Sequence, residues 1–288
     1  MYTYVNGTRI YFDIDGEGLT PDGAVIRKKP TVVMVHGGPG ADHTVSKPYF
    51  SQLTDIAQVV FYDHRGNGRS SGDDPNQWNL AQWGDDLHGL CDALGIERPI
   101  VIGTSFGGFV SLAYATRHPD HAAGLVLIST AAKVEFQEVY QAFERLGGAE
   151  IAKIAQEYWE NPTEDGRALY RDRCVPLYQR VESASLEWLS RVLWRNETAL
   201  HFNGPYAEHG RMDFRNDLNR IACPVLLMVG EEDPITPPVF SDVIADHLPE
   251  SQLTYHRFAD CGHGVVADRP EEARRAIRTF IERIADDN

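Results

Sequence analysis

The sequence predicts an α/β fold in which a mostly parallel sheet is covered by helices on both faces. Short β-branched runs recur along the chain, helical patterns separate them, and no repeat of 20–50 residues is present. At 288 residues, with 42% hydrophobic and 24% charged residues, the chain can bury a large core as one large domain or two modest ones. The alternation of strand and helix decides the fold class.

The chain opens with a predicted hairpin. Residues 3–14 alternate apolar and polar side chains around Asn6-Gly7, a dipeptide typical of two-residue hairpin turns. We expect this antiparallel pair at an edge of the sheet. The Gly- and Pro-punctuated stretch at 15–30 predicts a long connection without an assigned role.

The parallel strands are predicted from near-continuous apolar runs, which are typical of strands buried on both faces. They fall at 31–36, 59–63, 99–103, 125–129, 225–230 and 253–258, with helical patterns at 83–94, 106–117 and 271–284. The rhythm breaks once, at 131–215, where charged and aromatic residues recur at helical spacing. We therefore expect a core domain of residues 1–130 and 216–288, and a helical cap inserted at 131–215.

Composition excludes several classes of function. The chain has 27 Lys+Arg against 42 Asp+Glu, a formal net charge of −15 that would repel a phosphate backbone, so nucleic acid is not an expected partner. No secretory signal and no apolar run long enough to cross a membrane is seen, and the four cysteines form no CxxC pair. We expect a cytoplasmic protein without cofactor or metal, and its oligomeric state stays open.

The stretch Gly103-Thr104-Ser105-Phe106-Gly107 lies between a predicted strand and a predicted helix. This is the G-x-S-x-G nucleophile elbow in the context it requires, a sharp turn that raises the serine hydroxyl above the sheet. The glycines relieve crowding that a Cβ would cause. Ser105 is therefore the candidate nucleophile.

A serine needs a base, and the base needs a group that orients it. His263 follows the last predicted strand between glycines, and Asp233 follows the penultimate one, which gives the chain order Ser, Asp, His expected of such a sheet. Glu231, Glu232 and Asp260 remain competitors for the role of Asp233. Cys261 lacks a base of its own and is interpreted as a packed thiol.

The loop after the first parallel strand reads His36-Gly37-Gly38-Pro39-Gly40 and predicts the second donor of an oxyanion hole. We assign the donors to the N–H groups of Gly38 and Phe106, with Gly37 as the alternative to Gly38. A metal at His36, Asp63 and His64 is disfavoured because paired ligand spacing is missing. Asp63 and Arg65 are expected to brace the neighbouring oxyanion loop.

The motifs HGGPG (36–40), DHRGNGRS (63–70), GTSFGG (103–108), GEEDPITP (230–237) and CGHG (261–264) occur in order. With them the sequence resembles the α/β-hydrolase superfamily, and HGGPG with D-x-R-G-x-G-x-S looks like its proline iminopeptidase-like branch. This resemblance implies the α/β-hydrolase fold with an inserted cap, and an N-terminal proline exopeptidase, a carboxylesterase or a lactone hydrolase.

The sequence departs from the peptidase pattern of that branch. Phe106 stands where those peptidases often have Trp or Tyr, and Pro234 replaces a glutamate that follows the triad aspartate in some of them. We therefore predict a carboxylesterase acting on a small ester, with proline iminopeptidase acting on a short peptide, lactone hydrolase and a non-catalytic binding protein as alternatives. Glu208, Trp194 and Tyr206 in the cap are candidate substrate contacts, although a surface role for Glu208 is favoured.

Overall fold

A computed structural model describes residues 1–181 and 188–286 of the chain. Within these ranges, eight strands form one sheet in the order β1-β2-β6-β5-β7-β8-β9-β10. The strands from β6 to β10 are parallel to one another, and β2 joins them antiparallel. The bounds are β1 (Tyr2–Val5), β2 (Thr8–Asp15), β5 (Thr31–Val35), β6 (Gln58–Tyr62), β7 (Ile100–Thr104), β8 (Gly124–Ile128), β9 (Val225–Gly230) and β10 (Leu253–Phe258).

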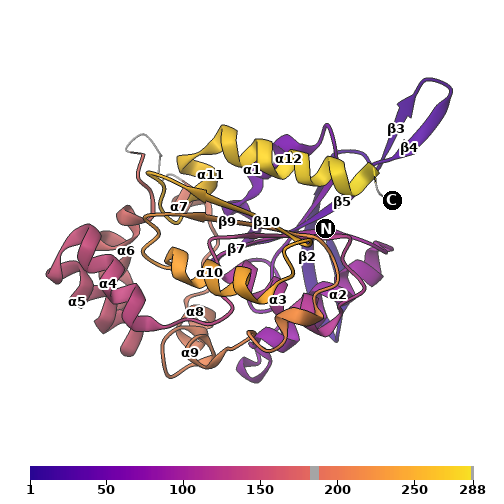
Figure 1. The fold of residues 1–288 in the computed structure, drawn as a ribbon. Coiled ribbons are helices and arrows are strands. Elements are labelled where there is room, and N and C mark those ends of the chain that lie inside the picture. Colours follow the sequence, from indigo (N-terminus) through magenta and orange to yellow (C-terminus); the bar gives the residue numbers. More distant parts are fainter. Residues whose placement is uncertain (182–187, 287–288) are drawn as a thin grey trace.

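Helices cover both faces of this sheet (Figure 1). The helices α2 (Leu80–Leu94), α3 (Phe106–Arg117) and α10 (Pro238–His247) cover one face, while α1 (Lys47–Phe50) and α12 (Pro270–Asp286) cover the other. Successive strand residues point to opposite faces, so Val33 and Val101 pack under α2 and α3, whereas Val32 and Ile100 pack under α12. Because both of their faces are buried, the central strands β5, β6, β7, β8 and β9 are almost entirely apolar.

The helix α2 shows why local sequence fixes the element bounds. Asn79 is its N-cap and accepts a hydrogen bond from the backbone N–H of Gln82, and Gly95 ends the helix in a left-handed conformation with a φ of 67°. The helix predicted at 83–94 ends at the observed residue, but the prediction omits the first turn of α2. The helix at 106–117 was predicted at its observed bounds.

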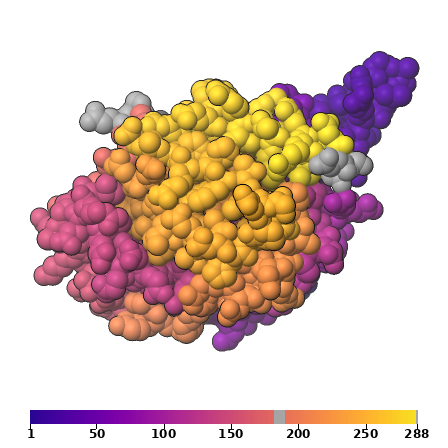
Figure 2. Space-filling view, viewed as in Figure 1, coloured from indigo at the N-terminus to yellow at the C-terminus, as the bar shows by residue number. Residues whose placement is uncertain are grey.

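The N-terminal hairpin predicted around Asn6-Gly7 is confirmed as β1 and β2 at the edge of the sheet. The connection at 15–30 holds a second hairpin that the sequence analysis missed, formed by β3 (Leu19–Asp22) and β4 (Val25–Lys28). Most of its side chains are exposed and it projects from the body of the protein (Figure 2). Exposure on both faces removes the alternating pattern by which strands are predicted.

Between β8 and β9 the described residues contain a group of helices in place of further strands, which Figure 1 shows mainly beyond one end of the sheet. Among the helices in the described ranges, none combines the length and apolar composition needed to cross a lipid bilayer. The members of the inserted group are α4 (Phe136–Gly147), α5 (Ala149–Glu160), α6 (Glu164–Arg173), α7 (Trp188–Arg191), α8 (Asn196–Phe202) and α9 (Glu208–Arg211). The short helix α11 (Val265–Asp268) precedes α12.

Candidate active site

Ser105 lies in the turn between β7 and α3, with a φ of 55° and a ψ of −119°. Such a conformation is costly for a residue other than glycine and persists only where the surroundings enforce it. The Ser105 N–H donates to the carbonyl of Ile128 at 2.9 Å, and the hydroxyl of Thr130 donates to the carbonyl of Ser105 at 3.0 Å. The end of β8 therefore holds the strained turn in place.

Gly107 explains the second glycine of the elbow motif. A Cβ at this position would lie 2.0 Å from the carbonyl oxygen of Val35 and 2.7 Å from that of His36. The first turn of α3 thus packs directly on the backbone at the end of β5. Only glycine permits this approach, which sets Ser105 beside the loop that follows β5.

That loop carries the predicted oxyanion donors. A Cβ on Gly37 would lie 2.9 Å from the carbonyl of Thr104 and 3.4 Å from the Cβ of Ser105, so the loop contacts the elbow. Gly38 follows with a φ of 67°, and the N–H of Gly40 donates to Oδ1 of Asn67 at 2.5 Å. The structure therefore places Gly37 against Ser105, with Gly38 as the next residue of the loop.

The polar side chains of the DHRGNGRS segment make contacts that differ from expectation. Arg65, expected to brace the oxyanion loop, forms a buried two-bond ion pair with Asp86 of α2. Asn67 of the DHRGNGRS motif contacts the loop by accepting the N–H of Gly40, and the backbone N–H of His64 donates to Nε2 of His36 at 3.3 Å. Asp63 accepts hydrogen bonds from the N–H and Nδ1 of His43, also near that loop. A sequence pattern does not show which polar side chain of a tight turn points back to its neighbour.

His263 and Asp233 form a buried pair at the ends of β10 and β9. Nδ1 of His263 lies 2.8 Å from Oδ2 and 3.0 Å from Oδ1 of Asp233. The Asp233 carboxylate also accepts the N–H groups of Ile235 and Thr236 and the hydroxyl of Thr236, at 2.8–2.9 Å. Both oxygens are therefore fixed, and they hold the imidazole by one of its two nitrogens.

The charge of Asp233 follows from these contacts. Burial alone would raise the pKa of its carboxyl, but the charge and hydrogen bond of His263, together with the hydrogen bonds of Thr236, bring the pKa below its ordinary value. The carboxylate therefore stays ionised at neutral pH and favours a proton on Nδ1 of His263. The other ring nitrogen, Nε2, is the one left to exchange a proton with a serine.

The backbone of His263 is held from the same strand end as Ser105. The hydroxyl of Ser129 donates to the carbonyl of His263 at 2.8 Å, and Ser129 directly follows Ile128, which binds Ser105. A Cβ at Gly230 would lie 2.1 Å from the carbonyl of Gly262, so the histidine loop packs on the end of β9. The structure thus gathers Ser105, Asp233 and His263 at the carboxyl edge of the sheet.

Asp268 and Tyr178 belong to this neighbourhood and were missed by the sequence analysis. The buried Asp268 accepts the N–H of Gly262 at 2.7 Å and the N–H groups of Arg180 and Val181 at 2.9–3.1 Å. The ring of Tyr178 meets that of His263 edge to face at 5.2 Å. Neither residue sits in a recognisable motif. The partners of Asp268 are backbone N–H groups, and Tyr178 lies far earlier in the chain than the histidine that its ring contacts.

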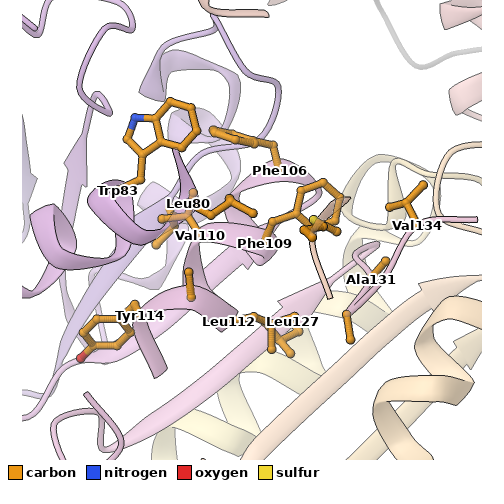
Figure 3. Close-up of a cluster of buried hydrophobic side chains, with 14 of the residues drawn as sticks. Leu80, Trp83, Phe106, Phe109, Val110, Leu112, Tyr114, Leu127, Ala131 and Val134 are labelled. Carbon is orange, nitrogen blue, oxygen red and sulfur yellow. The ribbon is translucent and has the colours of Figure 1, made fainter. Parts of the chain in front are cut away.

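Phe106 turns its side chain away from the reaction centre into the core. Its ring packs edge to face on Trp83 of α2, at 5.1 Å (Figure 3). The ring also packs edge to face on Phe202 of α8, at 5.0 Å. Phe106 is 1% exposed. Its side chain therefore anchors the elbow, while its backbone N–H is the group at the start of α3 where a negative charge is favoured.

The predicted cap residues lie in different surroundings. Tyr206 is 76% exposed and, with Glu208, lines a hollow of about 800 Å³ between α8, α9 and the segment before α2. Both carboxylate oxygens of Glu208 are 3.1 Å from the N–H of Leu80, at the start of α2. The ring of Trp194 lies 5.2 Å from the guanidinium of Arg167 and is not among the residues that line the hollow.

Cys261 beside the histidine is buried, and burial raises the pKa of its thiol to about 12. A thiol that stays protonated at neutral pH is a poor nucleophile. This agrees with its interpretation as a packed side chain.

The sequence from residue 27 to residue 270 matches the family described as serine aminopeptidase, S33. The chain belongs to this family. The fold is that of the α/β hydrolases, the branch is proline iminopeptidase-like, and the protein is a serine hydrolase. These findings confirm the family and the fold class that the ordered motifs indicated.

Individual relatives carry several activities in their names. The chain is 30% identical to the candidate carbamate hydrolase RutD of Caulobacter sp. strain K31, over 86% of this chain and 94% of RutD. It is 27% identical to the proline iminopeptidase PfmaB of Pestalotiopsis fici, over 98% and 99% of the two chains.

Among solved structures, a thermophilic esterase from Thermogutta terrifontis is 26% identical with a TM-score of 0.74, covering 99% of this chain and 97% of the other. Proline iminopeptidase from Mycobacterium smegmatis has a TM-score of 0.79 at 22% identity, covering 99% and 98%, and shares the fold. Membership in the family therefore establishes the class of enzyme, whereas the substrate has to be inferred from the site.

Proposed function

We propose that this serine hydrolase cleaves carboxylic esters through an acyl-enzyme, with Ser105 as nucleophile, His263 as base and Asp233 as the group that orients it. The observation that carries the proposal is the buried His263–Asp233 pair, which lies at the same edge of the sheet as the strained Ser105. With Nδ1 engaged by the carboxylate, Nε2 takes the proton of the serine hydroxyl.

The reaction then runs in two halves. The Ser105 oxygen bonds to the ester carbonyl carbon as its proton passes to His263, and the resulting tetrahedral adduct expels the alcohol, which takes that proton. A water molecule attacks the acyl-serine in the second half, again losing its proton to His263. The adduct releases the carboxylic acid and the proton returns to Ser105. Asp233 stabilises the imidazolium in both halves.

The oxyanion of each adduct would accept the N–H groups of Phe106 and Gly38, with Gly37 as the alternative to Gly38. Phe106 begins α3, whose first N–H groups lack partners within the helix and carry a partial positive charge. Gly38 belongs to the loop that packs on the elbow. One such donor in a water-poor site is worth about 3 kcal/mol of barrier.

We infer that the enzyme prefers an ester to an N-terminal proline amide from the partners that its acidic side chains have within the protein. A peptidase of this kind needs a carboxylate to receive the substrate's ammonium group. Glu231 and Glu232, next to Asp233, pair with Arg257 and Arg180, and Glu208 accepts the N–H of Leu80. These groups already have partners in the protein.

We further propose that residues 131–215 form a cap over the site and line the pocket for the acyl or alcohol group. Tyr178 supports this role because its ring contacts His263. Phe136, Trp159 and Phe202 surround His209 at ring distances of 5.1–5.4 Å, so the inserted helices share one aromatic core. An apolar cap of this kind suits an ester better than a charged peptide end.

Proline iminopeptidase is the second candidate, favoured by the names of the relatives and by the hollow beside Glu208. The two activities share the proposed catalytic residues and differ in what the cap recognises. Burial raises the pKa of Glu208, which makes its carboxylate a weaker partner for an ammonium group at low pH.

The test measures hydrolysis of short p-nitrophenyl esters and of proline p-nitroanilide by the wild type and by Ser105→Ala. We expect ester turnover that disappears in the variant and no release from the proline amide. Rapid release from the proline amide would reverse the ranking and make Glu208→Gln the next variant. If neither substrate reacts and a fluorophosphonate leaves Ser105 unlabelled, the protein is a binding member and the proposal is wrong.

A further inference from the structure

A cluster of histidine and aspartate side chains lies on the surface between α2 and the turn that follows α3, which pack side by side (Figure 1). We call it the histidine cluster and define it as His88, Asp92, His118 and His121. The rings of His88 and His118 stack at 4.0 Å with an interplanar angle of 20°, and the ring of His121 lies 4.5 Å from that of His88. Three imidazoles at such distances are not needed for catalysis at Ser105.

We propose that the histidine cluster binds a transition-metal dication such as Zn²⁺ through His88, Asp92 and His121. A ring nitrogen of each histidine and a carboxylate oxygen of Asp92 all lie within 4.8 Å of one another. Ligand atoms bound to a tetrahedral zinc ion lie about 3.3 Å apart, given bonds of about 2.0–2.1 Å. His88 Nδ1 and Asp92 Oδ2 already have this spacing, at 3.2 Å.

Two of the three ligands come from a single turn of helix. His88 and Asp92 are four residues apart on α2, so their side chains lie one above the other on the same face. His121 arrives from the neighbouring turn after α3. The Asp92 side chain is 64% exposed and that of His88 is 29% exposed, so an ion reaches them from solvent and both can adjust to it. Water would complete the coordination.

The donor set selects the class of metal. Two imidazoles and one carboxylate suit Zn²⁺, Ni²⁺ and Cu²⁺, whereas Mg²⁺ and Ca²⁺ prefer oxygen ligands. The imidazoles must be neutral to bind.

Further side chains hold the ligands in position. Nδ1 of His121 is 2.5 Å from the hydroxyl of Tyr114. Such a hydrogen bond to one ring nitrogen orients an imidazole whose other nitrogen binds a metal. His118 is held by Asp85 at 2.9 Å and supports the ring of His88 by stacking.

The histidine cluster is separate from the proposed reaction centre. Ser105 precedes the first residue of α3 and His118 follows the last, so the 12 residues of the helix place them about 18 Å apart. An ion here would join α2 to the turn after α3. The net charge of −15 also favours the approach of a cation.

The experiment titrates the full chain, freed of metal by a chelator that is then removed, with Zn²⁺ by calorimetry at neutral pH. We expect one tight site per chain, no comparable heat with Mg²⁺, and a Zn²⁺-dependent rise in the thermal midpoint. His88→Ala and His121→Ala should each weaken binding at least tenfold. His247→Ala, which removes an exposed histidine on α10, is the matched control and should bind as the wild type.

Cobalt gives a readout that does not depend on the variants. Co²⁺ bound by two imidazoles and a carboxylate in tetrahedral geometry absorbs visible light strongly, and added Zn²⁺ should abolish this absorption. If the wild type does not bind Zn²⁺ at about 100 μM, or if the folded double variant of His88 and His121 binds it as tightly as the wild type, the proposal is wrong. A binding site removed by His263→Ala instead would place the metal at the reaction centre and also overturn it.

Discussion

Replacing Asp233 by asparagine tests the proposed machinery most directly. The change keeps the size of the side chain, and its oxygen can still accept the N–H groups of Ile235 and Thr236, so the loop after β9 should keep its shape. What is lost is a negative charge buried against His263. An asparagine amide donates toward Nδ1, which then carries no proton, so Nε2 is protonated and cannot accept one from Ser105.

The magnitude follows from the geometry of the pair. Nδ1 and Oδ2 are 2.8 Å apart, so the charges of an imidazolium and the carboxylate are centred about 4 Å apart, which is worth about 4 kcal/mol at an effective dielectric constant of about 20. At about 1.4 kcal/mol per tenfold change, this corresponds to a roughly 10³-fold fall in kcat. The wrong tautomer lowers kcat further, toward about 10⁴-fold.

The assay is ester hydrolysis, with kcat and KM measured separately for the wild type, Asp233→Asn and a control. Asp260→Asn is the matched control, since Asp260 is in the same loop region as His263 but its side chain is 88% exposed. We expect a large loss in kcat, little change in KM and an unchanged thermal midpoint for Asp233→Asn. A loss of less than tenfold, or a comparable loss in Asp260→Asn, would refute the assignment of Asp233.

Three further predictions concern stability and positioning. Gly107→Ala places a Cβ 2.0 Å from a carbonyl oxygen and should lower the free energy of unfolding by more than 2 kcal/mol in urea titrations, whereas Gly18→Ala, which meets only the side chain of Gln58, should not. Asp268→Ala leaves three N–H groups without their acceptor and should lower kcat more than it raises KM, because the loop before His263 loses its tether. Burial lowers the pKa of His209 from 6.5 to about 3, so the unfolded chain takes up a proton at a higher pH than the folded chain does. The free energy of unfolding therefore falls by about 1.4 kcal/mol per pH unit as the pH drops from about 6.5 to 3. His209→Phe should lessen this loss between pH 7 and pH 5.

The core of the fold was open to prediction because its signals are local. The strands from β5 to β9 are short apolar runs, and the elbow is a contiguous motif between a strand and a helix, so both can be predicted from neighbouring residues. The hairpin of β3 and β4 has no buried face and left no such pattern. The residues on either side of the hairpin determine that it projects from the body of the protein, so its own residues do not predict this position.

The surroundings of the site were harder to predict because they depend on contacts between distant segments. Asp268 acts through backbone N–H groups at 180, 181 and 262, and backbone donors have no sequence signature. Glu208 was considered as a substrate contact, but it meets the start of α2, 128 residues earlier in the chain. The roles of Trp194 and Tyr206 as substrate contacts stay predictions.

The division between the sheet and the inserted helices explains why relatives with one fold carry different activities in their names. Ser105, Asp233 and His263 are held by hydrogen bonds with residues at the ends of β7, β8 and β9. The segment at 178–181 contacts the histidine loop through Asp268, through the backbone of Gly262 and Gly264, and through the ring of Tyr178. Substitutions in the inserted helices can therefore change what is bound without disturbing the proposed catalytic residues, so the choice between ester and proline amide should follow residues 131–215.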